Sequence, residues 1–248
     1  MKVVVCVNHV PDTETKIKVG ADNKSIDKAG VNFMLSPYDE FAVEEALRLK
    51  EKLGGEVTVM SLGGDVHKET LRKALAMGVE KAVLLKDDSV RDSYGVAKGL
   101  ADEIKTMSPD MVLFGKQSID YDNGQIGTLV AEMLGISSVS VVVKLTVEND
   151  RVVCEREIEG GHETVETKLP CVIQAQRGLN EPRYPSLKGI MGAKTKPILE
   201  KPAAPSEIRV ETVHMSKPSA KAAGKIVGTD KSAVAELVRL LHEEAKVI

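Results

Sequence analysis

The sequence predicts an α/β fold, a doubly wound and mainly parallel sheet with an antiparallel extension and a C-terminal arm. Short apolar runs alternate with amphipathic helical patterns through the first half of the chain, and this βαβα order is typical of parallel sheets covered by helices. Hydrophobic residues make up 42% of the 248 residues but aromatic residues only 3%. The core must therefore be built from aliphatic side chains, which suits a buried parallel sheet.

Each element of the first half follows from its own pattern. Residues 3–7 are an apolar strand, and residues 38–55 are a helix that ends at two glycines. A strand at 56–64 and a helix at 66–77, which Gly78 ends, come next. They are followed by a strand at 81–86, a helix at 94–107, a strand at 110–116 and a helix at 126–134 with Gly135 beyond it. The apolar stripe of the first helix consists of Phe41, Ala42, Ala46, Leu49 and Leu53.

The pattern changes after Gly135. Residues 138–176 contain strands joined by the tight turns "END" and "EGG", which predicts the antiparallel extension. Residues 196–228 are rich in Pro, Ala, Lys and Ser and have no sustained period, so they are either a flexible tail or an arm that lies on a partner. A final amphipathic helix is expected at 231–246. Its apolar face would carry Val234, Leu237, Val238 and Leu241.

Several functional classes are disfavoured. A formal net charge of -3 disfavours a nucleic-acid binder, and the apolar run before Asn8 is too short for a signal peptide or a membrane span. Three widely spaced cysteines indicate reduced core residues of a cytoplasmic protein. The five histidines lack metal-ligand spacing, and no nucleophile elbow, P-loop or G-x-G-x-x-G fingerprint occurs. With no catalytic constellation, the sequence favours a binding or carrier protein over a hydrolase.

Three strand ends carry unusual loops: "VNHVPD", "SLGGD" and "GKQSIDYDNGQIG". The N–H groups at residues 124–127 open a helix and could hold a phosphate, because the first turn of a helix offers unpaired donors. Asp120, Asp122 and Asn123 could contact a ribose or base, or Asp122 and Asn123 could simply cap the helix. The glycines at 63 and 64 favour a ligand, since both loops would face one crevice. Lys116 could meet a phosphate or be an ordinary surface lysine.

Two further segments have alternative interpretations. Five glutamates, at positions 155, 157, 159, 163 and 166, form an acidic ribbon with strand-like alternation, most simply a solvated strand face or a sheet edge protected by charge. Residues 179–194, "LNEPRYPSLKGIMGAK", are punctuated as a loop but contain Leu187, Ile190 and Met191 among basic residues. These apolar side chains either fold back onto the core or are displayed to a partner.

The combined motifs resemble a known family. The segment "EREIEGGHETVETKLPCVI", followed by "LNEPRYPSLKGIMGAK", is similar to the signature region of electron transfer flavoprotein beta subunits. The segments "SPYDEFAVEEALRLKE" and "GKQSIDYDNGQIG" resemble two more motifs of that family, and the resemblance runs from residue 1 to about residue 200. It implies an electron carrier subunit rather than an enzyme, with a nucleotide-binding domain of the adenine-nucleotide alpha-hydrolase type.

The resemblance also implies cofactors and partners. The redox-active FAD would lie mainly on an alpha subunit, while this chain would bury a structural AMP. Residues 1–195 would form the nucleotide-binding domain, including the recognition loop 179–194, and residues 196–248 would form an arm and helix that pack on the alpha subunit. Electrons would pass from acyl-CoA or other flavin dehydrogenases, as in fatty acid oxidation, to a quinone oxidoreductase or similar acceptor, with no nucleic acid and no membrane insertion.

The AMP site carried over from the family would consist of Cys6, Asn8, Ser36, Pro37, Tyr38, Ser61, Leu62, Gly63, Asp120, Asp122, Asn123, Gly124, Gln125, Ile126, Gly127 and Thr128. Partner contacts would come from Glu157, Tyr184, Leu187, Lys188, Ile190 and Met191. Glu157 would pair with an alpha-subunit arginine. Leu187 would enter a pocket on the dehydrogenase, with Ile190 and Met191 packed beneath it on a short helical turn.

Three other functions remain open from the sequence. A bifurcating electron transfer flavoprotein would bind a second FAD in this subunit in place of AMP. A stand-alone ATP-binding enzyme or stress-protein-like module would share the fold by analogy alone. An interaction scaffold would leave the cleft without a nucleotide.

Overall fold

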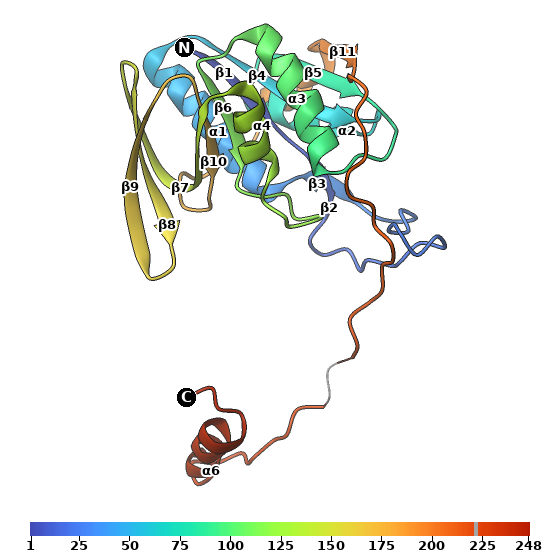
Figure 1. The fold of residues 1–248 in the computed structure, drawn as a ribbon, viewed down its shortest axis with the longest axis vertical. Coiled ribbons are helices and arrows are strands. Elements are labelled where there is room, and N and C mark those ends of the chain that lie inside the picture. The colour runs from blue at the N-terminus through green and yellow to red at the C-terminus, as the bar shows by residue number, and fades with distance from the viewer. Residues whose placement is uncertain (221–222) are drawn as a thin grey trace.

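The computed structural model describes residues 1–220 and 223–248. Within these residues, nine strands form one sheet of order β11-β5-β4-β1-β6-β10-β7-β8-β9 (Figure 1). Its parallel part contains β1 (Lys2–Cys6), β4 (Glu56–Gly63), β5 (Lys81–Lys86), β6 (Met111–Gly115) and β10 (Cys171–Ala175). The α/β class and the parallel order are as predicted.

The antiparallel extension is also confirmed. Strand β7 (Ser137–Glu148) pairs in parallel with β10, and then β8 (Arg151–Ile158) and β9 (Gly161–Lys168) continue from it as antiparallel neighbours. The turns at 149–150 and 159–160 join these strands, and Asn149 and Gly160 have positive φ angles of 59° and 82°. Tight turns of this kind select such residues.

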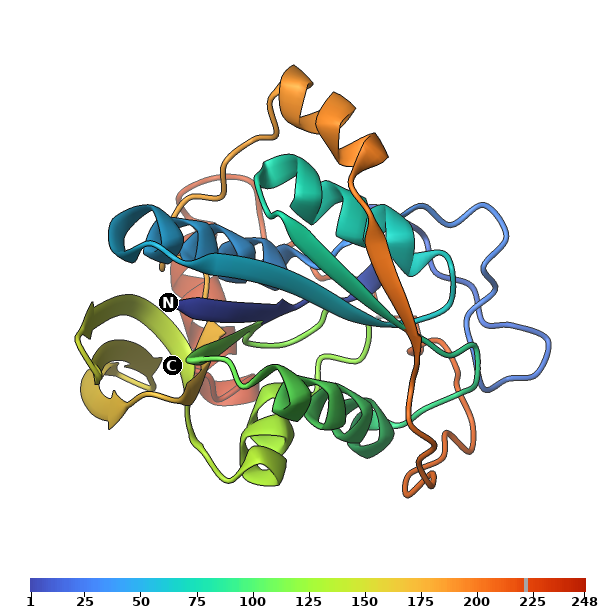
Figure 2. The same cartoon turned by 90° about the horizontal axis from the view of Figure 1, so that it is seen from above.

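Helices cover both faces of the sheet (Figure 2). On one face, α1 (Pro37–Leu53) and α2 (His67–Met77) pack against side chains that include Val3 and Val5 of β1. On the other face, α3 (Ser93–Met107) and α4 (Ile126–Leu134) pack against Val4 and Cys6. Successive side chains of a strand point to opposite faces, so one apolar strand contributes to both cores.

The glycines that were predicted to end helices do so. Gly54 follows α1 with φ 74°, Gly78 follows α2 with φ 130°, and Gly135 follows α4 with φ 67°. Each donates its N–H back to a carbonyl of the last helical turn. A residue with a side chain would be strained in this left-handed region.

Two strands were not predicted in the first third of the chain. Strands β2 (His9–Pro11) and β3 (Phe33–Leu35) form a short antiparallel pair that leads from β1 into α1. Three-residue strands carry no periodicity that sequence patterns can detect.

The boundary of the arm requires a correction. Residues 196–228 were expected to lack regular structure, but β11 (Ile198–Pro202) pairs in parallel with β5 at one edge of the sheet. Strand β11 forms because its main chain pairs with the free edge of β5. Its half-exposed side chains show no clear apolar pattern in the sequence. The extended arm therefore begins after Pro202.

The C-terminal helix is shorter than expected. The α-helix α6 (Ala233–Arg239) continues as a π-helical turn, Leu240–Glu244, and lies apart from the sheet in Figure 1. Its apolar face is uncovered, since Val234, Leu237 and Val238 are 56%, 45% and 49% exposed. No helix among the described residues is both long and apolar enough to cross a bilayer.

Candidate functional site

The strand order creates a switch point between β1 and β6. From β1 the chain moves outward to β4 and β5, and it then returns to place β6 on the opposite side of β1. Ligands of open parallel sheets bind at the carboxyl ends of the strands at such a point. The three predicted loops, after β1, β4 and β6, all leave this edge of the sheet.

Asn8 joins the loops on the two sides of the switch point. Its side-chain Nδ2 donates to Ser118 Oγ at 2.8 Å and to Asp120 Oδ2 at 3.0 Å. Its Oδ1 accepts the main-chain N–H of His9 at 2.9 Å. The amide orientation is therefore fixed by three contacts, and Asn8 orients the Asp120 carboxylate.

Asp39 fastens the same two strand ends from the first turn of α1. One carboxylate oxygen accepts the N–H of Asn8 at 2.8 Å and the other accepts the N–H of Gly115 at 3.0 Å. Burial raises the pKa of Asp39 to about 7, while the two N–H donors act in the opposite direction. The sequence pattern does not reveal this role of Asp39, because an acidic residue in the first turn of a helix ordinarily indicates only a favourable dipole interaction.

The start of α1 contributes three of the predicted residues. Ser36 precedes the helix, is buried, and donates its main-chain N–H to Asn8 O at 3.2 Å. Its hydroxyl has no hydrogen-bond partner among the described residues. Pro37 occupies the first helical position, and the Lys116 ammonium lies 5.2 Å from the centre of the Tyr38 ring. A buried hydroxyl without a partner leaves one polar group available to a ligand.

The carboxyl end of β4 is organised by a histidine that was not predicted. Ser61 donates its hydroxyl to Val7 O at 2.7 Å, so its second contact, at 2.8 Å, must accept a proton from His67 Nδ1. Burial, aided by nearby positive charge, lowers the pKa of His67 to about 4, which keeps the ring neutral. The ring then fills the space beside Gly63, where an added Cβ would lie 2.2 Å from Nε2.

Leu62 and Cys6 are structural members of the predicted set. Leu62 packs against α3, where a Cβ at Gly99 would come within 2.6 Å of its side chain. Cys6 is buried beneath the switch point, and burial together with the negative charge of Asp39 raises its thiol pKa. Both therefore belong to the core on the α3 face of the sheet, and Cys6 remains a neutral thiol.

The loop between β6 and α4 does not cap its helix with a side chain. Gln125 occupies the position before α4 and makes no side-chain cap. Asp122 instead accepts from the Gln117 side chain, and Asn123 Nδ2 donates to Ser93 Oγ at 2.8 Å. The simpler interpretation, in which Asp122 and Asn123 cap the helix, is therefore wrong. The first N–H groups of α4 have no side-chain cap, as an anion site requires.

The first turn of α4 is held close to the sheet. Gln174 of β10 is 1% exposed, and its Nε2 donates to Thr128 Oγ1 at 2.9 Å. A Cβ at Gly127 would lie 2.8 Å from Gln174 Cδ. Only glycine permits this approach, which fixes the predicted phosphate donors relative to β10.

The residues fit a phosphate-bearing nucleotide better than a metal ion. An uncapped helix start, a hydroxyl without a partner and an oriented carboxylate are the donors and acceptors that a phosphate and a ribose require. In the described parts of the chain, His, Cys, Asp and Glu form no cluster that could hold a metal. Predicted residues from four separate segments thus meet at one edge of the sheet.

The loop at residues 179–194 displays its apolar side chains. Tyr184 is 97% exposed and Leu187 is 75% exposed, at the start of helix α5 (Leu187–Thr195), which Ser186 caps by accepting from Gly189 N at 3.0 Å. The short helix is as expected, but Ile190 and Met191 are also exposed and do not pack beneath Leu187. Instead, Ala193 is buried. The four apolar side chains and Lys188 are all exposed within eight residues of chain, and they are hereafter called the display surface.

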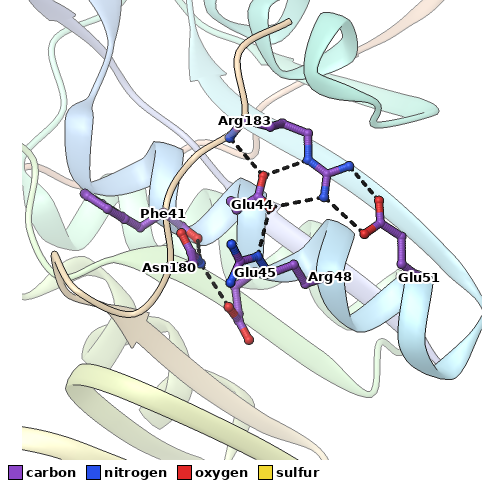
Figure 3. A network of polar contacts seen from close by, with 7 residues as sticks. All are labelled: Phe41, Glu44, Glu45, Arg48, Glu51, Asn180 and Arg183. Carbon is purple, nitrogen blue, oxygen red and sulfur yellow. Dashed lines mark hydrogen bonds and ion pairs between the residues drawn. The ribbon is translucent and has the colours of Figure 1, made fainter.

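The loop is mounted on α1 through Arg183 and Asn180 (Figure 3). The Arg183 guanidinium contacts Glu44 at 2.8 Å and Glu51 at 2.6 Å, and its main-chain N–H also donates to Glu44 at 3.1 Å. Asn180 Nδ2 donates to Phe41 O at 3.0 Å and to the Glu45 carboxylate at 2.9 Å. The beginning of the loop is therefore fixed by charge-assisted bonds, which sequence patterns did not reveal.

The other end of the loop is fixed on α2. Arg72 donates to Ala193 O at 2.5 Å and also contacts Lys196 O. The Lys196 ammonium donates to Leu75 O at 3.1 Å and Val79 O at 2.7 Å, where α2 ends. A cation at this end of a helix satisfies carbonyls that lack helical partners. Both ends of the display surface are thus held on the body.

The acidic ribbon is mostly paired across strands. Glu155 pairs with Lys144, Glu163 with Arg156 at 2.9 Å, and Glu166 with Arg151. The side chains of these three glutamates are 41–54% exposed, so the predicted solvated strand face is confirmed, with its charges paired to cations on neighbouring strands.

Glu157 differs from those three glutamates. Gln176 donates an amide N–H to its carboxylate at 2.8 Å. Its hydrogen-bond partner is thus neutral, and the carboxylate remains exposed on β8.

The chain is similar in sequence to proteins of one known family. The model of the electron transfer flavoprotein domain family matches residues 24–206. A protein of Syntrophomonas wolfei named electron transfer flavoprotein subunit beta is 41% identical over 249 residues, covering 100% of this chain and 98% of that protein. The protein of the same name from Bacillus subtilis is 39% identical, and the mitochondrial one from Arabidopsis thaliana is 34% identical, each covering 100% of both chains.

Proposed function

Because this chain belongs to the electron transfer flavoprotein family as a beta subunit, we propose that it binds AMP at the switch point and forms a heterodimer with an alpha subunit that holds FAD. The assembly relays electrons from flavin dehydrogenases, such as acyl-CoA dehydrogenases, to a quinone oxidoreductase or a similar acceptor. FAD supplies the redox chemistry, and this chain supplies nucleotide binding, subunit contacts and partner docking.

One observation carries the nucleotide proposal. The uncapped first turn of α4 lies at the same sheet edge as the Asp120 carboxylate, which Asn8 orients from the other side of the switch point. The phosphate of AMP would accept from N–H groups at the start of α4, near residues 124–127. Asp120 and the unpartnered Ser36 hydroxyl would accept from or donate to the ribose and base.

The docking proposal rests on the display surface. Leu187 and Tyr184 are exposed to water on a loop that is fixed at both ends, which is unfavourable for large apolar side chains. A partner that covers them would account for this exposure. Leu187 would anchor the dehydrogenase contact. Lys188 would favour encounter with an acidic partner surface. Glu157 would pair with an alpha-subunit arginine through its exposed carboxylate.

The experiment is a count of nucleotides in the intact heterodimer. We would produce the chain together with an electron transfer flavoprotein alpha subunit, denature the purified complex and quantify the released nucleotides by chromatography. One FAD and one AMP per heterodimer are expected. Two FAD per heterodimer would contradict the AMP assignment and indicate the bifurcating type.

Two other outcomes would contradict the proposal more broadly. A complex that releases no adenine nucleotide besides FAD would indicate a scaffold. A chain that purifies alone as a monomer and hydrolyses ATP would indicate the stand-alone enzyme.

A further inference from the structure

The first part of the C-terminal arm lies on the N-terminal turn of α3. Arg91, whose side chain is only 8% exposed, donates to Ala204 O of the arm at 2.7 Å and to Gly95 O of the helix at 2.9 Å. Its third contact, with Asp87 at 2.5 Å, holds the guanidinium in place. An arginine in this position joins the arm, the helix and the preceding loop through a planar set of donors.

Asp92 is the second and more central contact. One oxygen of its carboxylate accepts Gly95 N at 2.8 Å and caps α3. The other oxygen accepts two consecutive N–H groups of the arm, Arg209 N at 2.8 Å and Val210 N at 2.9 Å. The Arg209 guanidinium also lies 3.6 Å from the centre of the Tyr94 ring. The Asp92 carboxylate thus caps α3 and also holds the arm, and both sets of hydrogen bonds are charge-assisted.

Contacts beyond this point are weaker. Glu211 pairs with Lys24 at 2.7 Å, but both side chains are at least half exposed, so water screens the pair. Met215 N donates to Asn23 O at 2.7 Å, on an exposed loop. The main attachment of the arm is therefore the set formed by residues 91–95 and 204–210, hereafter the α3 clasp.

The α3 clasp adjoins the candidate nucleotide loop. Ser93, the first residue of α3, accepts from the Asn123 side chain at 2.8 Å. The residue immediately before it, Asp92, holds the arm. One helix start therefore sets the position of the arm relative to the loop that precedes α4.

We propose that the α3 clasp positions the arm for association with the alpha subunit, and that Asp92 is its main positioning residue. This inference rests on the proposed heterodimer. The clasp fixes where the arm leaves the body, so that the alpha subunit meets an arm whose first eight residues are already ordered. Ordering a segment before association removes an entropic cost from binding. Loss of the clasp should therefore weaken the heterodimer without disturbing the α/β body.

The test compares Asp92→Asn with Asp102→Asn, a change of the same charge on the same helix at a residue whose ion-pair partner in the described part of the chain is Lys98. Asparagine is as good a helix cap as aspartate, but it offers one oxygen in place of two, and its NH₂ group would face the arm N–H donors. Val210→Pro is the companion variant, because it deletes one of these donors from the arm side and leaves the Asp92 cap intact.

Two measurements would be made on the full chain and its complex. Hydrogen exchange of the amides at 209 and 210 should accelerate about tenfold in Asp92→Asn, as expected for loss of charge-assisted bonds. Exchange of labelled alpha subunit between heterodimers should also accelerate, by about three- to tenfold. Asp102→Asn should change neither. Val210→Pro should accelerate the alpha-subunit exchange in the same direction as Asp92→Asn.

The outcomes that overturn the inference differ from those that overturn the heterodimer. Unchanged amide exchange in Asp92→Asn would show that no clasp forms. Faster amide exchange with unchanged alpha-subunit exchange, in either clasp variant, would show that the clasp does not position the partner. If the unaltered chain fails to bind an alpha subunit, the proposed function is refuted, while amide exchange on the chain alone still reports the clasp.

Discussion

Replacing Arg183 with glutamine should detach the start of the loop that carries the display surface from helix α1. Arg183 pairs with Glu44, whose side chain is 4% exposed, and with Glu51, whose side chain is 58% exposed. The Glu44 contact dominates, because water screens the outer pair. The variant removes the charge and shortens the side chain, and it leaves Arg48 as the cationic partner of Glu44 among the described residues.

The magnitude follows from burial. Breaking a fully buried pair costs about 3–5 kcal/mol, but the Arg183 side chain is 34% exposed and Arg48 still neutralises part of the charge. We expect the free energy of unfolding to fall by roughly 1.5–2.5 kcal/mol. Freeing the start of the loop also restores conformational entropy, which should weaken dehydrogenase binding about fivefold.

The pH dependence of the free energy of unfolding provides an independent check on the direction of this effect. Burial opposes ionisation of Glu44, but bonds from Arg183 and Arg48 outweigh it and lower the pKa of Glu44. A lowered carboxyl pKa stabilises the fold above the unfolded-state pKa of about 4.3, and this stabilisation is lost as pH falls through the folded-state value. The difference between the unaltered chain and Arg183→Gln should therefore be largest at neutral pH and shrink in acid.

The assay combines urea unfolding of the heterodimer with surface-based measurement of dehydrogenase affinity. Arg48→Gln is the matched control, because it removes a contact to the same Glu44 at 3.0 Å without touching the loop. It should lower stability modestly and leave dehydrogenase affinity unchanged. Equal affinities for Arg183→Gln and the unaltered chain, or an equal loss in Arg48→Gln, would refute the idea that Arg183 positions the display surface.

Three further predictions concern the display surface and the switch point. Leu187→Ala should weaken dehydrogenase binding by about 1–3 kcal/mol, measured by calorimetry, while the heterodimer keeps its flavin; unfolding or loss of flavin would mean that Leu187 is structural. Gly127→Ala should displace Gln174, because the new Cβ would lie 2.8 Å from its Cδ, and the released AMP per heterodimer should fall; full AMP occupancy would contradict the placement of the phosphate at α4. Asp39→Asn should flatten the pH dependence of unfolding. The pKa of Asp39 is raised to about 7. Its contribution to the free energy of unfolding, at most about 4 kcal/mol, is therefore fully present below about pH 4 and is lost as the pH rises to about 7. An unchanged slope of the unfolding free energy against pH would mean that Asp39 does not titrate in this range.

The parallel sheet could be predicted from the sequence, because its strands are buried on both faces and read as apolar runs. Its helices carry apolar stripes, and α1, α2 and α4 each end at a glycine. Prediction failed where main-chain pairing alone decides the structure. Strand β11 has half-exposed side chains and owes its place to the free edge of β5. The pair β2 and β3 is too short to show a period.

The candidate site also contains residues that could be predicted from the sequence and residues that could not. Its glycines and the polar loop after β6 could be identified from local motifs, and the segments do meet at one edge of the sheet. Asp39, His67 and Gln174 could not be identified, because each acts on a segment far from it in the sequence or on a neighbouring turn through a specific rotamer. Hydrogen-bond geometry of this kind leaves no periodic signal.

The two surfaces proposed for partners share one physical design. The display surface is exposed at Leu187 but fastened through Arg183 to α1, and the arm is extended but fastened through Asp92 to α3. In each case, a charged side chain binds main-chain or carboxylate groups near the start of an exposed segment. A carrier that meets several partners requires accessible segments, yet each disordered residue adds an entropic cost to every encounter. Anchoring the base of each segment lowers that cost while leaving the contacting side chains free.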